Sequence, residues 1–383
     1  MNNTIKLSKE TLDAIDSPRD FFVSLRDNDH VSDLEIHADG PITVWRRRSR
    51  KYVFDQITDH ARDAFVEKIE GEMQGTHRTE YAANYETSFR IALSDESRAR
   101  VHALAEDKGM SIAVRIQPLR PPLPFECFGG EDERSTAIVT SVRELFSAHQ
   151  GLIIFSGPVG HGKTTWQHAH YREINETPRT DGHVPHLYLA ADPQEFYHVN
   201  KEAVFTQREI GHNALSYASV LKGALRVRHD ILDIGEMRGD AETTDAIIKA
   251  MIMGSRGVTT AHTYTAAQAV NRFISSSKDF PREQMVELFK QLVIGIINVR
   301  LVPETNGELT LAVELANLLG MGGNIEALDD PSQFTSVLET TQNGANRTLE
   351  ADLAELVRLQ RITQETAFTA CNNEDRMKKA LIS

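Results

Sequence analysis

The alternation of hydrophobic and polar positions divides the chain into two parts. In the first part, residues 32–37 alternate apolar and polar side chains like a half-buried strand, and residues 59–69 carry apolar side chains at helical spacing. The pattern predicts further strands in residues 42–53, 89–93 and 112–116, and helices in residues 8–15 and from residue 17 onward. Residues 1–117 are therefore expected to form a small α/β domain.

A proline-rich segment follows this domain. Four prolines fall within residues 118–124. Such a segment is extended and fairly stiff, because each proline ring fixes φ and removes a backbone donor. Residues 118–130 are the expected interdomain linker.

From residue 131 onward strands and helices alternate, which predicts a parallel sheet with crossover helices. Strands are expected in residues 152–155, 186–191, 231–234 and 258–262, helices in residues 135–149, 165–172, 218–227 and 243–254, and a hairpin in residues 294–302 and 309–314. Residues 318–383 are polar and helical, with a clear amphipathic stretch in residues 349–359. Residues 131–383 are thus expected to be a second α/β domain that ends in a helical region.

Composition and charge restrict the class of partner. With 40% hydrophobic and 25% charged residues, the chain has the composition of a soluble globular protein. Its net charge of −13 argues against an extended nucleic-acid-binding surface. One dense basic run, residues 46–51, has two readings: a contact for anionic lipid or nucleic acid, or the solvated face of a strand pair. Its aromatic and β-branched neighbours favour the strand pair.

Other features place the chain in the cytoplasm. No apolar run approaches the roughly 20 residues that a membrane span needs, and the N-terminus lacks a secretory apolar core. Cys127 and Cys371 lie far apart and indicate neither a disulfide framework nor a zinc site.

A phosphate-binding loop follows the apolar run 152–155. Residues 157–164 fit the pattern G-x-x-x-x-G-K-[ST], between a predicted strand and a predicted helix. The glycines allow backbone N–H groups to approach phosphate oxygens, Lys163 can reach the β- and γ-phosphates, and the Thr164 hydroxyl suits Mg²⁺. ATP and Mg²⁺ are the expected cofactors. The expected nucleotide contacts are Gly157, Pro158, Val159, Gly160, His161, Gly162, Lys163, Thr164 and Thr165.

Three more segments, residues 191–196, 230–238 and 260–263, follow the loop in order. Together the four segments resemble the Walker A, Asp box, Walker B and His box of the secretion ATPase superfamily of type II and type IV secretion. The Gly-Glu-Met-Arg sequence that ends the third segment is similar to that of type IV pilus retraction motors. Within the superfamily, the chain looks most like the ATPases of type IVB systems, the Dot/Icm secretion and IncI-type plasmid-transfer machines. The resemblance implies a PAS-like N-terminal domain and a RecA-like ATPase domain.

The resemblance also assigns roles to the two glutamates. Glu195 matches the Asp-box glutamate that orients or deprotonates the attacking water, and Glu236 matches the Walker B glutamate that helps hold Mg²⁺ through its water shell. Their alternatives are a surface glutamate after a turn and an ion-pair partner for Arg238. Asp233, inside the same strand as Glu236, is expected to make a structural hydrogen bond.

Further roles come from the His box and the helix after it. His262 matches a histidine that donates to the γ-phosphate, and Arg272 matches an arginine that couples the site to its surroundings. The sequence departs from the retraction motors in two places. Ala191 stands where they usually carry a glutamate, which puts a second carboxylate in doubt, and Ser255 lies near the place of the first His-box histidine.

Hydrolysis also needs positive charge on the γ-phosphate in the transition state. In the family that charge comes from arginines of the first domain, partly across a subunit boundary. Arg115 and Arg98 are the first candidates and Arg100 the third, each with a surface salt bridge as its alternative.

These inferences predict a cytoplasmic, Mg²⁺-dependent ATPase that forms a homohexameric ring at the inner-membrane base of a type IV secretion or conjugation apparatus. A type IV pilus retraction motor is the nearest alternative. A nucleic-acid translocase is another alternative, and the acidic net charge argues against it. A non-catalytic nucleotide-dependent scaffold is the last, and the presence of Lys163, Glu195 and Glu236 argues against that.

Overall fold

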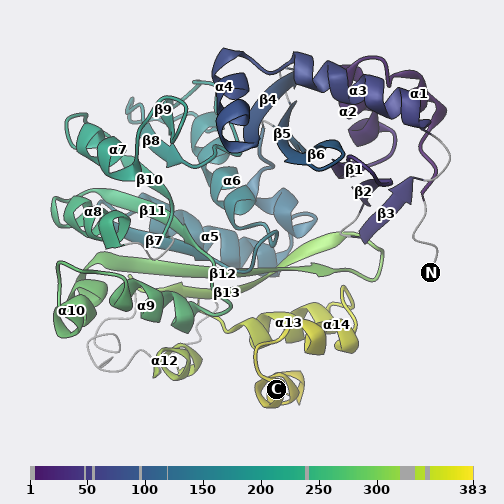
Figure 1. Cartoon of the computed structure of the whole chain (residues 1–383). Helices are drawn as coiled ribbons and strands as arrows, with labels where there is room; N and C mark the ends of the chain where they lie inside the picture. Colours follow the sequence, from purple (N-terminus) through teal and green to yellow (C-terminus); the bar gives the residue numbers. More distant parts are fainter. Residues whose placement is uncertain are drawn as a thin grey trace. The chain divides into compact units, whose positions relative to one another are not determined.

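The computed structural model describes residues 5–46, 49–53, 57–94, 97–118, 120–237, 241–319, 333–340 and 346–382. It divides into two units, Met1–Arg120 and Pro121–Ser383, so the boundary lies inside the proline-rich segment (Figure 1). Each unit has its own sheet and its own hydrophobic core. Among the described residues, no helix combines the length and the apolar character required to cross a bilayer.

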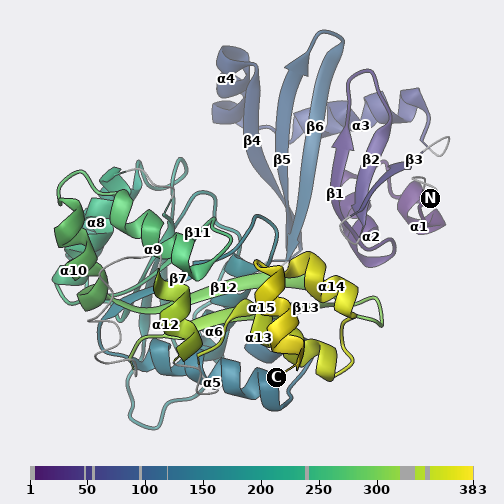
Figure 2. The same ribbon diagram turned by 90° about the horizontal axis from the view of Figure 1, so that it is seen from below.

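Unit 1 is an antiparallel sheet covered by helices. The strand order is β3-β2-β1-β6-β5-β4, which can be followed from right to left in Figure 2. The side chains of Phe21, Phe22 and Phe65 pack edge to face in the core, which joins two of the helices to the sheet. The strands are β1 (Val31–Ile36), β2 (Ile42–Arg46), β3 (Ser49–Val53), β4 (Glu86–Ser94), β5 (Ser97–Glu106) and β6 (Gly109–Pro118), and the helices are α1 (Lys9–Asp13), α2 (Pro18–Asp27), α3 (Asp59–Gly71) and α4 (Gly75–Asn84).

The basic run lies on a strand pair. Strands β2 and β3 are antiparallel neighbours, with Val44 opposite Lys51 and Trp45 opposite Arg50. The run therefore belongs to a hairpin of the sheet, as its β-branched and aromatic neighbours predicted. Arg47 and Arg48 lie outside the described residues.

Unit 2 contains the expected parallel sheet with crossover helices. Its strand order is β13-β12-β7-β11-β10-β8-β9, in which β13 alone runs antiparallel to its neighbour. The strands are β7 (Gly151–Ser156), β8 (His186–Ala191), β9 (Val204–Glu209), β10 (Ile231–Glu236), β11 (Arg256–Ala261), β12 (Val293–Pro303) and β13 (Leu309–Asn317). The helices between them are α6 (Lys163–Glu176), α7 (Tyr217–Ala224), α8 (Ala241–Ile252), α9 (Ala266–Ser275) and α10 (Arg282–Leu292), and α5 (Glu133–Ser147) precedes the sheet.

Strand β7 is buried on both faces, which explains its unbroken apolar sequence. Leu152 and Ile154 face the core that includes α7 to α10, whereas Ile153 and Phe155 face the core that includes α5 and α6. A central parallel strand with helices on both sides has no solvent face, so its side chains do not alternate in polarity.

The end of the expected linker packs against unit 2. Residues Pro124–Phe128 form a 3₁₀ helix, and the Phe128 ring is fully buried edge to face on Trp166, with ring centroids 5.3 Å apart. This packing anchors residues 124–128 in unit 2.

The C-terminal region is helical where it is described, with α12 (Phe334–Thr340), α13 (Leu349–Arg358), α14 (Gln364–Ala370) and α15 (Glu374–Ile382). A fully buried ion pair joins it to the sheet domain: Arg134 of α5 donates to Asp352 of α13, with nitrogen–oxygen distances of 2.9 and 2.5 Å. Arg347 and the backbone N–H of Val313 also donate to the Asp352 carboxylate.

Candidate active site

Four loops that carry candidate residues meet at one edge of the parallel sheet. Strand β11 lies between β7 and β10, and β10 pairs on its other side with β8. Parallel strands end at the same edge, so the phosphate loop after β7, the loop after β8, Glu236 at the end of β10 and His262 after β11 come together there. Ligands of open α/β sheets bind at this edge.

The phosphate loop has the conformation that its glycines permit. Gly157 has φ 144°, and a Cβ there would lie 2.5 Å from the carbonyl oxygen of Val299. Gly162 has φ 85° and precedes the first turn of α6. The loop therefore passes tightly over the sheet edge and leads into the N-terminus of α6, the kind of helix end that favours an anion.

Lys163, His262 and Glu236 form a line of polar contacts across the site. The Lys163 ammonium donates to the carbonyl of Pro158 at 2.9 Å and lies 3.0 Å from Nδ1 of His262. The Nε2 atom of His262 lies 3.3 Å from the Glu236 carboxylate. Because an ammonium can only donate, Nδ1 of His262 accepts and Nε2 carries the proton that faces Glu236.

The Lys163 side chain is almost fully buried, at 5% exposure. Burial lowers the pKa of its ammonium to about 8, while the charges of Glu236 and Glu195 oppose that shift. Both carboxylates therefore lie near enough to the phosphate loop for their charges to act on this ammonium.

Glu195 is held in place by its neighbours in the loop after β8. Gln194 and Phe196 are buried, and the amide of Gln194 donates to Gln207 of β9 at 2.8 Å. The side-chain oxygen Oε1 of Gln207 accepts this bond and also accepts from the backbone N–H of His198, at 2.9 Å. The Glu195 side chain between these two buried residues is half-buried, and its charge acts on Lys163.

The site contains the groups that a Mg-nucleotide requires. The close approach of Gly157 to Val299 and the buried ammonium of Lys163 make a cradle for phosphate oxygens. The Thr164 hydroxyl at the start of α6 and the Glu236 carboxylate, 21% exposed, are oxygen donors of the kind that Mg²⁺ prefers. The residues present therefore fit ATP with Mg²⁺.

The candidate arginines fall into two groups. Arg272 lies on α9 and donates to the backbone carbonyl of His262 at 3.4 Å. It therefore contacts the backbone of the histidine. Arg98 and Arg115 belong to unit 1, on β5 and β6. Arg115 donates to the Asp33 carboxylate at 2.7 Å and its side chain is 61% exposed, whereas Arg98 is buried. Arg115 thus makes the surface salt bridge that the sequence left as an alternative.

Asn298 is a site residue that the motifs did not reveal. It is fully buried on β12, and its amide nitrogen donates to the Ser156 hydroxyl at 2.9 Å and to the carbonyl of Thr263 at 3.2 Å. It therefore joins the strand before the phosphate loop to the loop after His262. The signal was available, because Asn298 is a polar interruption in the apolar run that became β12.

Asp233 makes the structural hydrogen bond expected of it. Gln167, one turn into α6, donates to its carboxylate at 2.8 Å. Full burial raises the pKa of Asp233 to about 8, although Tyr171 and Gln167 act in the opposite direction. Asp233 therefore links the phosphate-loop helix to β10.

Comparison with known families identifies the chain. The model of the family described as Type II/IV secretion system protein matches residues 83–378, which include the phosphate loop, Glu195, Glu236 and His262. The chain belongs to this family.

The chain is also similar to individual proteins, in sequence or in fold. The secretion-family chain is 28% identical over 308 residues to a twitching motility protein of Neisseria gonorrhoeae, covering 80% of this chain and 78% of the relative. It superposes on the crystal structure of the pilus retraction motor PilT with bound ADP with a TM-score of 0.75 and 26% identity, over 91% of this chain and 95% of PilT. It superposes on the ATPase DotB of Legionella pneumophila with a TM-score of 0.74 and 20% identity, over 91% and 94% of the two chains.

Proposed function

We propose that this secretion-family protein is a Mg²⁺-dependent ATPase, a cytoplasmic ring-forming motor that powers a type IVB secretion or conjugal transfer apparatus. The observation that carries the proposal is the line from Lys163 through His262 to Glu236, set against the phosphate loop and within the influence of Glu195. The similar structure of PilT contains bound ADP, which supports nucleotide binding by this fold.

Each side chain has a task that its position allows. The Lys163 ammonium, now held by Pro158 and His262, exchanges those contacts for the β- and γ-phosphate oxygens. Glu195 orients the attacking water and accepts its proton, because a half-buried carboxylate beside the phosphate cradle is well placed to do so. Thr164 and Glu236 would hold Mg²⁺, whose charge would offset that of the phosphates.

His262 is proposed to respond to phosphate binding at Lys163. When phosphate oxygens take over the ammonium of Lys163, the imidazole loses that donor and can take a proton on Nδ1 to donate toward the γ-phosphate. Arg272, through the carbonyl of His262, holds the loop in position.

The ring and the in-trans arginines are part of the same proposal. Arg115 and Arg98 of the first domain would supply positive charge to the γ-phosphate of a neighbouring subunit in a homohexamer. The first domain is proposed to be PAS-like and the second RecA-like, with residues 118–124 as the stiff connection about which they rotate. Docking to inner-membrane or cytoplasmic components of the apparatus completes the proposed machine.

A type IV pilus retraction motor is the second candidate. The observations that favour it are the similarity to a twitching motility protein and the superposition on PilT. The two candidates share the ATPase site and differ in the machine that the motor serves.

One pair of measurements tests the proposal. ATP hydrolysis by the purified chain should require Mg²⁺ and disappear in Lys163→Ala, and normal turnover in that variant would refute the site. Deletion of the gene should then abolish secretion or plasmid transfer and spare twitching motility. Loss of twitching alone would instead establish the retraction motor.

A further inference from the structure

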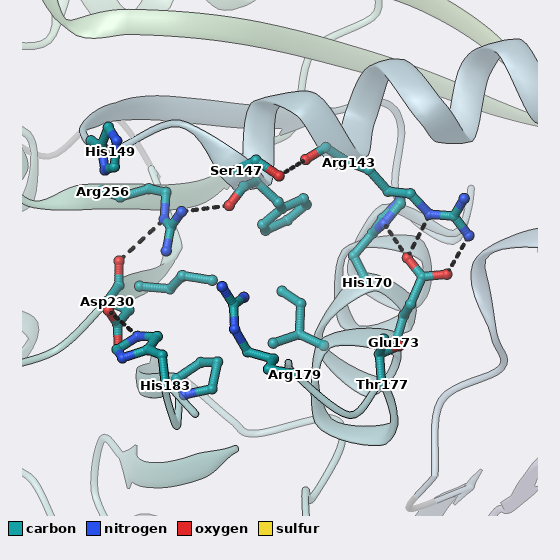
Figure 3. A pocket seen from close by; sticks show the side chains of 14 residues that line it. Arg143, Ser147, His149, His170, Glu173, Thr177, Arg179, His183, Asp230 and Arg256 are labelled. Carbon is teal, nitrogen blue, oxygen red and sulfur yellow. Dashed lines mark hydrogen bonds and ion pairs between the residues drawn. The ribbon is translucent and has the colours of Figure 1, made fainter. Parts of the chain in front are cut away.

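A second hollow lies at the opposite edge of the same sheet. It is a cavity of about 640 Å³, lined by the C-terminal parts of α5 and α6, the loop between α6 and β8, and the first residues of β10 and β11 (Figure 3). Asp230, at the cavity, precedes β10, and Glu236 of the active site ends that strand. A strand of this length spans about 20 Å, so the cavity is separate from the nucleotide site.

Arg256 is held at the cavity by backbone carbonyls. Its Nε donates to the carbonyl of Asp230 at 3.2 Å, and its Nη1 donates to the carbonyls of Phe146 and Ala148. Those carbonyls lie at the C-terminal end of α5, so Arg256 also caps that helix. Its Nη2 makes no hydrogen bond to any residue that the structure describes, and Figure 3 shows it on the side of the cavity.

Arg179 reaches into the cavity from the loop after α6 (Figure 3). Its Nε and Nη2 donate to the Asp181 carboxylate at 3.2 and 2.8 Å. This pairing uses one edge of the guanidinium, and within the described part of the chain Nη1 has no hydrogen-bond acceptor. The Asp181 carboxylate therefore orients Arg179 while one donor stays available.

The Arg179 guanidinium lies close enough to Arg256 for its charge to act there. Burial lowers the pKa of Arg256, the charge of Asp230 raises it, and the charge of Arg179 lowers it further. The Asp230 carboxylate is occupied elsewhere, since it accepts from the His183 ring at 2.9 Å and from the backbone N–H of His186 at 2.7 Å. Besides Arg143, which is paired with Glu173, the guanidinium groups of Arg179 and Arg256 thus line the cavity, and no carboxylate among the described residues bonds to the Arg256 side chain.

The remaining lining is mixed, with an apolar part beside polar side chains that include the ion-paired Arg143 and Glu173. Phe146, Ile231 and Pro185 are buried, and Ile174 is half-buried. The Phe146 ring stacks on His170, with centroids 5.2 Å apart. A ligand in the cavity would therefore meet guanidinium groups and a limited apolar surface, a combination found in small-molecule pockets.

We propose that this cavity binds a small organic oxyanion, a phosphate or carboxylate carried on an apolar body. The oxyanion would accept from Nη1 of Arg179 and Nη2 of Arg256, whose planar forks suit carboxylate and phosphate oxygens. The apolar body would lie against Phe146 and Ile174. Capping of α5 accounts for Nη1 of Arg256 and the carbonyl of Asp230 accounts for Nε, but neither contact explains the orientation of Nη2 or the approach of Arg179.

Phenyl phosphate and inorganic phosphate are the probes that test the proposal, titrated by calorimetry into the full chain carrying Lys163→Ala. That background weakens phosphate binding at the phosphate loop. Phenyl phosphate should bind saturably and more tightly than inorganic phosphate, because only the former has an apolar body. Adding Arg179→Gln should weaken its binding by about tenfold or more, the usual effect of losing one charge-assisted contact.

Two controls distinguish a binding role from a structural one. Arg358→Gln removes an exposed arginine of α13 and should leave the affinity for phenyl phosphate unchanged. Arg179→Gln in the otherwise natural chain should retain full ATP hydrolysis, since Arg179 lies at the far edge of the sheet. The proposal is overturned if phenyl phosphate shows no saturable binding, if Arg179→Gln binds it as tightly, or if inorganic phosphate binds equally well.

Discussion

The ammonium of Lys163 lies 3.0 Å from Nδ1 of His262, a residue 99 positions further along the chain. This contact joins the phosphate loop after β7 to the loop after β11, whose histidine is expected to contact the γ-phosphate. It also keeps the lysine buried, so that its charge depends on pH near neutrality.

ATP affinity should therefore fall in alkaline solution. Burial lowers the pKa of Lys163 to about 8, so the ammonium is charged below that pH and loses its proton above it. ATP binds the charged form, hence its dissociation constant should be flat below pH 7 and rise by up to about tenfold per pH unit above pH 8. Equilibrium binding between pH 6.5 and 9.5 measures this. Lys163→Ala should bind weakly and show no such rise, and an equal rise in that variant would assign it to another group.

Glu195→Gln should separate binding from hydrolysis. The amide keeps the size of the side chain but cannot take a proton, so turnover should fall by about 10²- to 10⁴-fold while ATP affinity changes little. Glu202→Gln, at an exposed position further along the same loop, is the matched control and should keep full turnover. A large loss of ATP affinity in Glu195→Gln would point to a role in holding the ligand instead.

Mixing variants tests whether Arg115 acts on a neighbouring subunit. Arg115→Ala and Lys163→Ala should each be inactive, yet their mixture should recover some ATP hydrolysis, because some sites combine an intact unit 2 with an intact unit 1 of a neighbour. A mixture of Lys163→Ala with Glu195→Gln should stay inactive, since both changes affect unit 2. Absence of recovery at every ratio of the first pair would leave Arg115 with its salt bridge to Asp33 alone.

Asp233→Asn should stabilise the protein at neutral and higher pH. Burial raises the pKa of Asp233 to about 8 from 3.8, so the folded state favours the protonated carboxyl. That contribution to stability is complete below pH 3.8 and is lost progressively as the pH rises toward 8. The neutral amide avoids this loss, so the variant's gain in unfolding temperature should be larger at pH 8 than at pH 5. A gain of the same size at both pH values would show that the carboxyl does not titrate in this range.

Asp352→Ala should loosen the C-terminal helices. The change leaves the fully buried guanidinium of Arg134 without its carboxylate and removes the acceptor of Val313, at a cost of about 3–5 kcal/mol. Chemical denaturation should show this loss, and limited proteolysis should cut α13 to α15 earlier. Asp375→Ala, at an exposed position on α15, is the control and should change stability by less than about 0.5 kcal/mol. A similar small effect for Asp352→Ala would mean that the ion pair does not hold the region.

Much of unit 2 was predictable because its signals are local. The glycines of the phosphate loop, the apolar run of β7 and the amphipathic pattern of α13 each depend on residues close in sequence. The predicted hairpin is also present as β12 and β13, with Val299 opposite Val313.

Other elements were not predicted, and for a common reason. Strand β9 is largely polar and is held by its pairing with β8 at the edge of the sheet, while β5 is a strand whose arginines and histidine obscure its apolar alternation. Their stability comes from partners distant in sequence, so a short window of residues does not reveal them.

The sequence alone determined which residue types are available at the site: a lysine after the glycines, glutamates after two strands and a histidine after a third. Only the tertiary structure decided that Lys163, His262 and Glu236 form one line, and that Asn298 joins their loops. The physical reason is the strand order, because β11 enters between β7 and β10 although it follows both in the chain. Which strands become neighbours depends on the packing of the whole sheet and its helices, and that packing decides which side chains of the four motifs touch.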